Sequence, residues 1–527
     1  MKTSTHTWRR HAAGTYSPGA YDATPALTDP YIALFGQSPP VAGSVASVGA
    51  HPLYDAVHNR RLLERESEIT AAFAAIEPAL KDAAALQYQE GAADRIQQLV
   101  RGQLGFELPV SCLQATWARP LNMRRLYAYC VFQTFRRLAD RNFDRSHADL
   151  SDGEPADEVI RKWGFHAIDI TPCADGRLSG VVDYILRVPP AVVVHRKSFA
   201  GSMFDVEESM RNWEQIELRR YREGVPNAAG EPTRYLKIGM YHFSSSRPNH
   251  EGCAAHGSDE RKAAQALLDR LNDFARAIEN SHCCGAAVAT LLVGVDTDND
   301  AIKVHVPDVR GEISLERCVD NRVLFERTAS LSRDEAKEAI RLAVADAAGV
   351  SPDDAATEGM RWFCAYLLKN NMAQIDYVRA WHNGCYADLG HTERFITVGD
   401  NFDDVQMRNL AYQAQMETIE EGATDMDVGI KIFKKLNMAR DLPIPVFIHF
   451  RYDGRVPGAR DRAVARCWRL TRAIQTRYPE LVREGWIYTY ATVKDGAPGS
   501  KLEEIDAQAA PDGQRPACGC NKSESRQ

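Results

Sequence analysis

Apolar residues recur at three- and four-residue steps in the stretch that follows residue 50. In the first such run they are Leu62, Ile69, Phe73, Ile76 and Leu80. This spacing places them on one face of an α-helix. Further helical runs cover residues 92–102 and 122–138. We therefore predict a helical domain over residues 51–150, and its residues suggest no site chemistry.

Between residues 151 and 392, short apolar runs alternate with amphipathic segments of helical period. Such alternation is typical of an α/β domain. We predict strands at residues 166–170, 181–188, 191–194 and 236–242, and a hairpin at residues 291–306. Helices are predicted at residues 205–223 and 258–280, where apolar positions share one face. The expected fold class is therefore α/β, preceded by the helical domain.

Two cysteines and a histidine stand at or beyond the ends of two predicted strands. Cys173 begins a Cys-x-Asp-x-Arg motif that also contains Asp175 and Arg177. The second strand ends at His242, and Cys253 lies in the loop beyond it. Because zinc prefers Cys and His ligands, and a catalytic zinc uses three of them and keeps one position for water, we predict such a site here. A bidentate ion pair from Arg177 would keep Asp175 off the metal and free to orient that water.

At these residues the chain resembles the β-class carbonic anhydrases. Its length, its helical leader and the long loop between His242 and Cys253 are similar to one divergent branch, the carboxysome shell carbonic anhydrases. The resemblance implies one Zn²⁺ per chain and reversible hydration of CO2 to bicarbonate, by attack of zinc-bound hydroxide on CO2. It also implies a place at the shell of the carboxysome, a bacterial microcompartment, where the enzyme would supply CO2 to Rubisco. A homodimer or a multiple of it is expected from the same likeness.

The identity of the histidine ligand is open to two interpretations. Common β-class enzymes place the last two ligands as His-x-x-Cys, which would select His250 with Cys253. Against this, His242 terminates a β-prone apolar run, whereas His250 follows the loop signal Arg-Pro-Asn. We therefore predict His242 as the ligand and keep His250 as the alternative.

The region at residues 393–515 looks like a second copy of the zinc domain. Its opening, ERFITVGDNFDD, parallels HAIDITPCADGR at residues 166–177, and a later strand carries His449 in the place of His242. No cysteine occupies the loop beyond His449, since Cys467 falls within the next predicted helix. We expect this copy to bind no metal and to close the wall of the active site. The zinc domain itself would then span residues 151–392.

Two other functions are compatible with the same three ligands. Related β-class folds hydrolyse carbonyl sulfide or carbon disulfide, and the sequence does not separate these gases from CO2. A shell scaffold with a structural zinc is the second alternative. Structural zinc sites usually have four protein ligands. Only three are apparent here unless His250 or His256 joins them, so we rank the scaffold lower.

Composition excludes several classes of partner. A net charge of −7 over 527 residues gives no indication of nucleic-acid binding. No apolar run approaches the length of a membrane helix, and the first residues lack the apolar segment of a secretory signal. These features indicate a soluble intracellular protein.

Residues 1–50 are rich in Pro, Gly, Ser, Ala and Thr and show no helical or strand period. We predict a disordered arm. Its basic and aromatic residues, such as Trp8, Arg9 and Arg10, suggest a tether that folds onto Rubisco or a shell protein, if the resemblance holds. A flexible tail is predicted at residues 516–527.

Overall fold

The structure is a computed structural model, and it describes residues 51–505 with internal gaps. The gaps are at residues 115–119, 147–160, 162, 189–192, 223–232, 283–287, 352, 354–357, 387–390, 403–404, 416–422 and 498. The arm predicted at residues 1–50 and the tail predicted at residues 516–527 lie outside the described residues, and both remain predictions.

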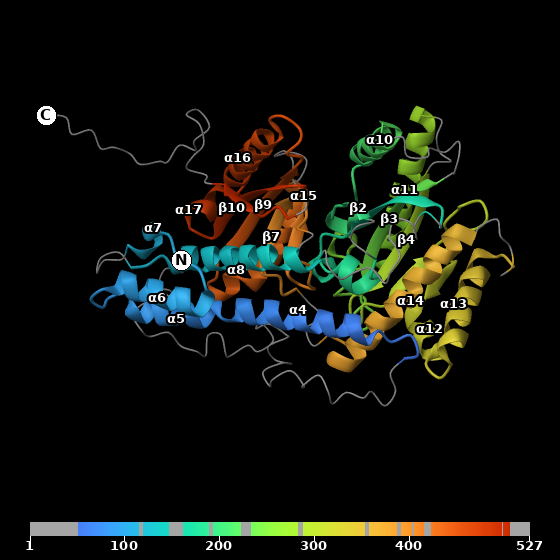
Figure 1. Cartoon of the computed structure of the whole chain (residues 1–527), viewed down its shortest axis with the longest axis horizontal. Helices are drawn as coiled ribbons and strands as arrows, with labels where there is room; N and C mark the ends of the chain where they lie inside the picture. The colour runs from blue at the N-terminus through green and yellow to red at the C-terminus, as the bar shows by residue number, and fades with distance from the viewer. Residues whose placement is uncertain are drawn as a thin grey trace.

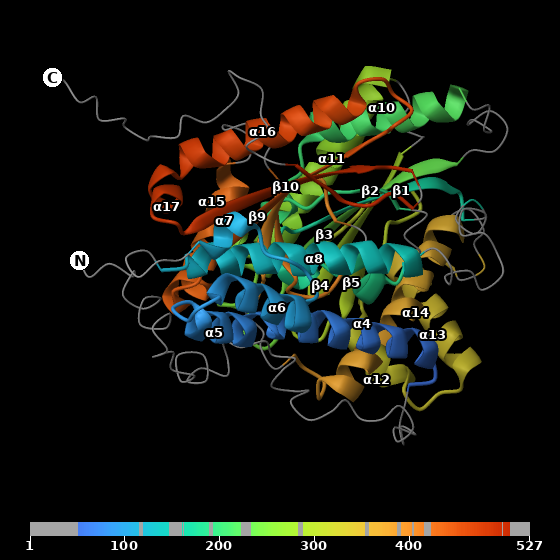
Figure 2. The ribbon, with the colours of Figure 1, turned by 60° about the vertical axis from the view of Figure 1, so that its left-hand side comes forward.

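The chain begins with the predicted helical region. Its helices are α4 (Ala56–Ala74), α5 (Ile76–Leu86), α6 (Ala92–Leu104), α7 (Val110–Leu113) and α8 (Met123–Ser146). Helix α8 runs beside the second of two sheets (Figures 1 and 2), where the ring of Phe135 packs 4.9 Å from that of Phe395. None of the helices in the described part of the chain has the length and apolar content needed to cross a bilayer.

The first sheet has the strand order β2-β1-β3-β4-β5-β6. The strands are β1 (Phe165–Pro172), β2 (Val193–Arg196), β3 (Arg234–Phe243), β4 (Val288–Asp296), β5 (Ile302–His305) and β6 (Cys318–Asp320). The pairs β1–β2, β1–β3 and β3–β4 are parallel, whereas β5 is antiparallel to β4 and β6 is antiparallel to β5. The helices of this half are α10 (Val206–Arg222), α11 (Glu260–His282), α12 (Asn321–Thr328), α13 (Arg333–Ala348) and α14 (Glu358–Trp381).

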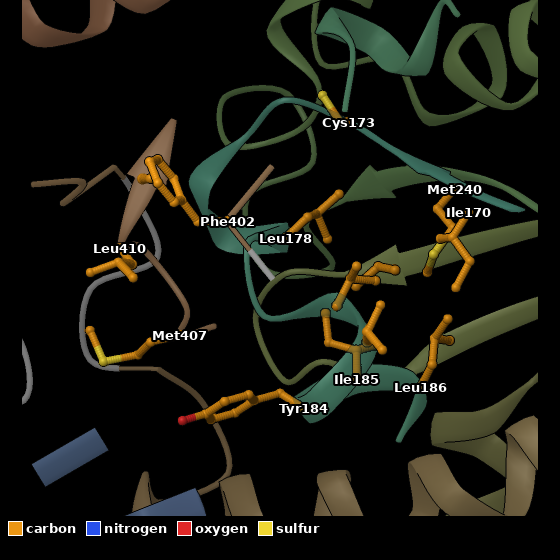
Figure 3. Close-up of a cluster of buried hydrophobic side chains, with 14 of the residues drawn as sticks. Ile170, Cys173, Leu178, Tyr184, Ile185, Leu186, Met240, Phe402, Met407 and Leu410 are labelled. Carbon is orange, nitrogen blue, oxygen red and sulfur yellow. The ribbon is translucent and has the colours of Figure 1, made fainter. Parts of the chain in front are cut away.

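The two faces of this sheet are covered by different elements. Helix α11 packs on the face that carries Gly239, because the side chain of Leu267 lies 3.0 Å from where a Cβ of that glycine would be. Ile170 and Met240 belong to a buried cluster that also contains Ile185 of the segment after β1 (Figure 3). Close helix contact on one face and an apolar cluster on the other bury almost all of β1 and β3, whereas β2 is partly exposed.

The strand predicted at residues 181–188 is wrong. Residues Val181–Leu186 instead form a short π-helix. Apart from Asp183 the run is buried and consists of apolar residues and a tyrosine, and such a pattern does not distinguish a strand from a buried helical turn. It packs against α14, with the ring of Tyr184 lying edge-on to that of Tyr377. The strand predicted next is confirmed in its described part, as β2 from Val193.

The second sheet has the order β11-β10-β9-β7-β8. Its strands are β7 (Phe395–Gly399), β8 (Ala411–Ala414), β9 (Ile444–Tyr452), β10 (Ile487–Asp495) and β11 (Glu503–Ile505), and its helices are α15 (Ala423–Leu436), α16 (Ala459–Arg477) and α17 (Pro479–Arg483). Strands β8, β7, β9 and β10 are parallel and β11 is antiparallel. The same arrangement holds for β2, β1, β3, β4 and β5 of the first sheet. The prediction of a helical region followed by two related α/β units is confirmed.

Candidate metal centre

Two neighbouring parallel strands bring Cys173 and His242 together. Cys173 follows the last residue of β1, and His242 is the penultimate residue of β3. The two strands pair from one end of β1 to the other, and β3 continues three residues further. Carboxyl ends of adjacent parallel strands open onto the same edge of a sheet, where ligands commonly bind. Cys253 comes from the loop between β3 and α11 and returns to this edge. All three residues are buried.

The three side chains form a compact group of metal-binding atoms. One sulfur or nitrogen atom of each lies within 4.8 Å of those of the other two. The sulfur atoms of Cys173 and Cys253 are 4.0 Å apart. Two thiolates on a tetrahedral zinc, each about 2.3 Å from the metal, would stand roughly 3.8 Å from one another. The spacing of the two sulfurs therefore fits this metal.

The ring of His242 gives a second indication of a metal. Its side chain is 1% exposed, yet neither ring nitrogen has a hydrogen-bond partner of ordinary geometry within the described residues. Leaving such a buried polar atom without a partner costs about 1–3 kcal/mol. A metal ion shared with the two cysteines would satisfy one of these nitrogens.

Asp175 and Arg177 form a closed pair beside this group. The guanidinium donates from Nε to Oδ1 at 3.0 Å and from Nη2 to Oδ2 at 2.7 Å, and the backbone N–H of Arg177 donates to Oδ1 at 2.9 Å. Burial works to raise the pKa of Asp175, but the positive charge of Arg177, with a smaller contribution from His391, outweighs it and holds that pKa well below its usual range. The carboxylate is therefore ionised and able to accept hydrogen bonds.

The guanidinium of Arg177 is held on its other side as well. Its Nη1 donates to the backbone oxygen of Glu251 at 2.8 Å and to the hydroxyl of Thr297 at 3.2 Å. The side chain is 1% exposed. Partners on both sides leave the planar group no freedom to turn away from Asp175.

Two residues at the site were missed from the sequence, His391 and Glu393. Nε2 of His391 lies 3.9 Å from Oδ2 of Asp175, and its Nδ1 lies 2.8 Å from Oε1 of Glu393. Burial alone would lower the pKa of His391, but the two carboxylates raise it to about 9. Both residues lie just before β7. Glu393 accepts from the amide of Gly176, within the Cys-x-Asp-x-Arg motif, and the two residues are 217 positions apart in the sequence. No local spacing could have revealed this contact.

The alternative ligand His250 lies elsewhere. It is exposed in the loop after β3, where its backbone N–H donates to the oxygen of Arg247. His256 is half-buried, with Nε2 at 3.3 Å from the backbone oxygen of Gly201. The structure thus places His242, rather than either of these, with the two cysteines.

His449 occupies the position in the second sheet that corresponds to His242. Its ring stacks on that of Phe402 at 4.3 Å, and its Nδ1 lies 3.0 Å from the hydroxyl of Thr492. Burial, with help from Arg451 and Lys494, lowers the pKa of His449 to about 3, so the ring is neutral. Cys467, within α16, donates instead to the backbone oxygen of Thr492.

Comparison with known proteins gives a consistent result over almost the whole described chain. Models of the N-terminal, catalytic and C-terminal domains of carboxysome shell carbonic anhydrases match residues 51–143, 155–391 and 392–509. The chain is 46% identical over 477 residues to the carboxysome shell carbonic anhydrase of Prochlorococcus marinus (strain MIT 9313), covering 88% of this chain and 92% of that protein. The protein of the same name from Halothiobacillus neapolitanus is 45% identical over 461 residues, covering 86% and 90%. That of Parasynechococcus marenigrum is 47% identical over 465 residues, covering 88% and 79%.

Proposed function

The chain belongs to the family of carboxysome shell carbonic anhydrases, and we propose that it hydrates CO2 reversibly with one zinc ion held by Cys173, His242 and Cys253. The observation that carries this proposal is the group of three buried donor atoms within 4.8 Å of one another. The unsatisfied ring nitrogens of His242 support it. A carbonic anhydrase role follows from the family, whereas the metal and its ligands are our proposal.

Zinc at this position would lower the pKa of a water molecule toward 7 and so supply a nucleophile at neutral pH. The residues of the chain would prepare the rest of the reaction. Arg177 occupies both carboxylate oxygens of Asp175 and keeps them from acting as a fourth ligand. The ionised Asp175 would accept the hydrogen bond of the attacking water and so fix its direction toward CO2.

We propose that residues 393–515 form a metal-free partner of the zinc domain at residues 151–392. The contacts of His449 support this, because its ring is stacked on Phe402 and held by Thr492 while Cys467 faces the backbone of β10. One zinc ion per chain is the consequence.

The family places the protein at the carboxysome shell. We propose that it supplies CO2 to Rubisco there, that residues 1–50 tether it to Rubisco or to a shell protein, and that it assembles as a homodimer or a multiple of one. A chain without residues 1–49 is the test of the tether. Full co-packaging of that chain into carboxysomes would contradict it.

The proposed reaction is tested by stopped-flow hydration of CO2 before and after removal of zinc with a chelator. We expect fast hydration that is lost with the metal and restored by added Zn²⁺. The family match does not favour a hydrolase of sulfur-containing gases or a scaffold with structural zinc. Protein that binds zinc but does not hydrate CO2 would nevertheless return both to consideration and refute the proposal.

A further inference from the structure

We infer that Glu393, a residue of the second half, is a positioning residue for the catalytic loop. It holds the Gly176 peptide, which lies between Asp175 and Arg177. The inference rests on the proposed function, because that function gives these two residues their catalytic roles. It assigns to the second half a specific task in the chemistry of the first.

Three backbone groups of the loop are bonded by the second half. The N–H of Gly176 donates to Oε1 of Glu393 at 3.1 Å. The oxygen of Gly176 accepts from the N–H of Asn409 at 2.8 Å, and the oxygen of Ala174 accepts from the N–H of Gln413 at 2.9 Å. The loop from Cys173 to Arg177 therefore takes part of its shape from residues far along the chain.

Glu393 also fills the space in which a side chain at position 176 would stand. A Cβ built on Gly176 would lie 2.3 Å from Cγ and 2.6 Å from Oε1 of Glu393. Real atoms do not approach so closely, so any residue other than glycine at position 176 would displace the Glu393 side chain. Glu393 is 3% exposed, and its charge is offset by His391, whose Nδ1 lies 2.8 Å from Oε1. The same oxygen therefore lies between the His391 ring and the Gly176 amide, which donates to it.

The position of this peptide determines the geometry of the catalytic pair. Asp175 and Arg177 are its two neighbours, and Oδ1 of Asp175 accepts the backbone N–H of Arg177. The Gly176 N–H belongs to the peptide group that follows Asp175, and the Arg177 N–H belongs to the next one. Releasing the first would let the backbone turn at Gly176, which changes the angle between the two peptide groups and the direction of both side chains. Residues that orient the groups around a metal commonly affect the rate 10- to 100-fold when removed.

The support behind these bonds is rigid. Glu393 stands two residues before β7, and Gln413 is a residue of β8, which pairs with β7 in the second sheet. Groups mounted on strands hold a site more accurately than groups on free loops. Holding the loop of the first half is thus a task that the second half performs without a metal.

The inference is tested on the full-length, zinc-loaded protein with the variants Glu393→Ala and Glu393→Gln. Asp441→Ala is the matched control. Asp441 is also a carboxylate of the second half with little exposure (13%), but it accepts from Arg124 of the helical region at 2.6 Å, away from the catalytic loop. Zinc content, kcat, KM for CO2 and amide hydrogen exchange of a peptide covering residues 174–179 are measured for each.

We expect Glu393→Ala to keep its zinc and its KM and to lose about 10- to 100-fold in kcat. Exchange of the 174–179 peptide should rise at least about tenfold, because the Gly176 amide loses its acceptor. Glu393→Gln keeps an acceptor oxygen and should remain within about threefold of the wild type in both measurements. Asp441→Ala should leave kcat and this exchange unchanged.

Wild-type kcat and exchange in Glu393→Ala would overturn the inference. So would a loss of activity that follows a loss of zinc, or the same loss in Asp441→Ala, because each would indicate a merely structural role. The exchange measurement does not depend on activity. If the wild-type protein fails to hydrate CO2, the proposed function fails, while slow exchange that depends on Glu393 still shows that this residue positions the loop.

Discussion

Oδ2 of Asp175 lies 3.5 Å from Nε2 of His242. A carboxylate this close to a proposed zinc ligand could bind the metal itself and occupy the position that water needs. Arg177 prevents this, because its guanidinium donates to both oxygens of Asp175. Asp175 is thus expected to orient the reacting water without binding the metal, and substitutions at Asp175 and at a ligand should have different effects.

Asp175→Asn should keep zinc and lose about 10- to 100-fold in the rate of CO2 hydration, because the amide presents a donor where an acceptor is needed. Cys173→Ser should instead lose zinc, since a neutral hydroxyl is a poor replacement for a thiolate. Metal analysis and stopped-flow hydration of both variants check this. Equal zinc content and equal rates in the two would contradict the assigned roles.

Arg177→Lys should keep one bound zinc but lose about 10- to 100-fold in rate. Lysine retains the positive charge and cannot reproduce the two-pronged contact with Asp175. The carboxylate would then be free to approach the metal as a fourth ligand. X-ray absorption at the zinc edge should report a carboxylate oxygen from the protein in the variant. The same coordination and the same rate as in the wild type would show that the ion pair is dispensable.

The two candidate histidines are distinguished by a matched pair of variants. His242→Ala should lose zinc and activity, since the ring completes the group formed with Cys173 and Cys253. His250→Ala should bind one zinc and hydrate CO2 at the wild-type rate, because this ring is exposed in the loop. Zinc analysis decides between them, and loss of metal from His250→Ala alone would reverse the assignment.

Asp425 predicts a dependence of stability on pH. Burial raises its pKa to about 6. The backbone amides of Ala200 and Gln415 donate hydrogen bonds to this carboxylate and lower the pKa by a smaller amount. Because the unfolded chain ionises at lower pH, the protonated form favours the fold. That stability is present below about pH 4 and is lost as the pH rises through 6. The charge then costs the folded state up to about 3 kcal/mol at pH 8, and roughly half of that at pH 5.

Asp425→Asn removes this charge and keeps an acceptor oxygen. Its melting temperature should therefore exceed that of the wild type at pH 8, by a difference that shrinks as the pH falls. Asp427→Asn, on the same helix, is the control. Its carboxylate is exposed and accepts from Arg477, which lowers its pKa, so its loss should slightly lower the melting temperature. A pH-independent difference for Asp425→Asn would contradict the prediction.

The sequence predicted the helices at residues 92–102, 122–138, 205–223 and 258–280 and the strands that lead to Cys173 and His242, but not α12, α13 or α14. It also indicated the two cysteine ligands and favoured His242 over His250. Apolar residues at steps of three and four mark helices, and the strand-like run that ends at His242 marks β3. The Cys-x-Asp-x-Arg motif indicated the site, because it places a zinc-binding cysteine beside an aspartate and the arginine that can pair with that aspartate. The second copy was also visible, since both halves repeat the order of strand, His-Phe, loop and helix.

The run Val181–Leu186 shows where local pattern failed. Apart from Asp183 it consists of β-branched and other large residues, so it is typical of a buried strand. Its conformation depends on where the chain must turn after β1 and on its packing against α14. Neither the position of that turn nor the packing against α14 can be read from the sequence of the run alone.

The sequence by itself determined many of the helices and strands and which side chains have the chemistry to bind a metal, because both depend on residue type and on spacing within a few turns of chain. Tertiary structure decided which histidine lies beside the cysteines, since the loop that carries His250 projects into solvent. It alone brought Glu393 to Gly176. A hydrogen bond between residues 217 positions apart depends on the packing of two sheets and leaves no period in the chain.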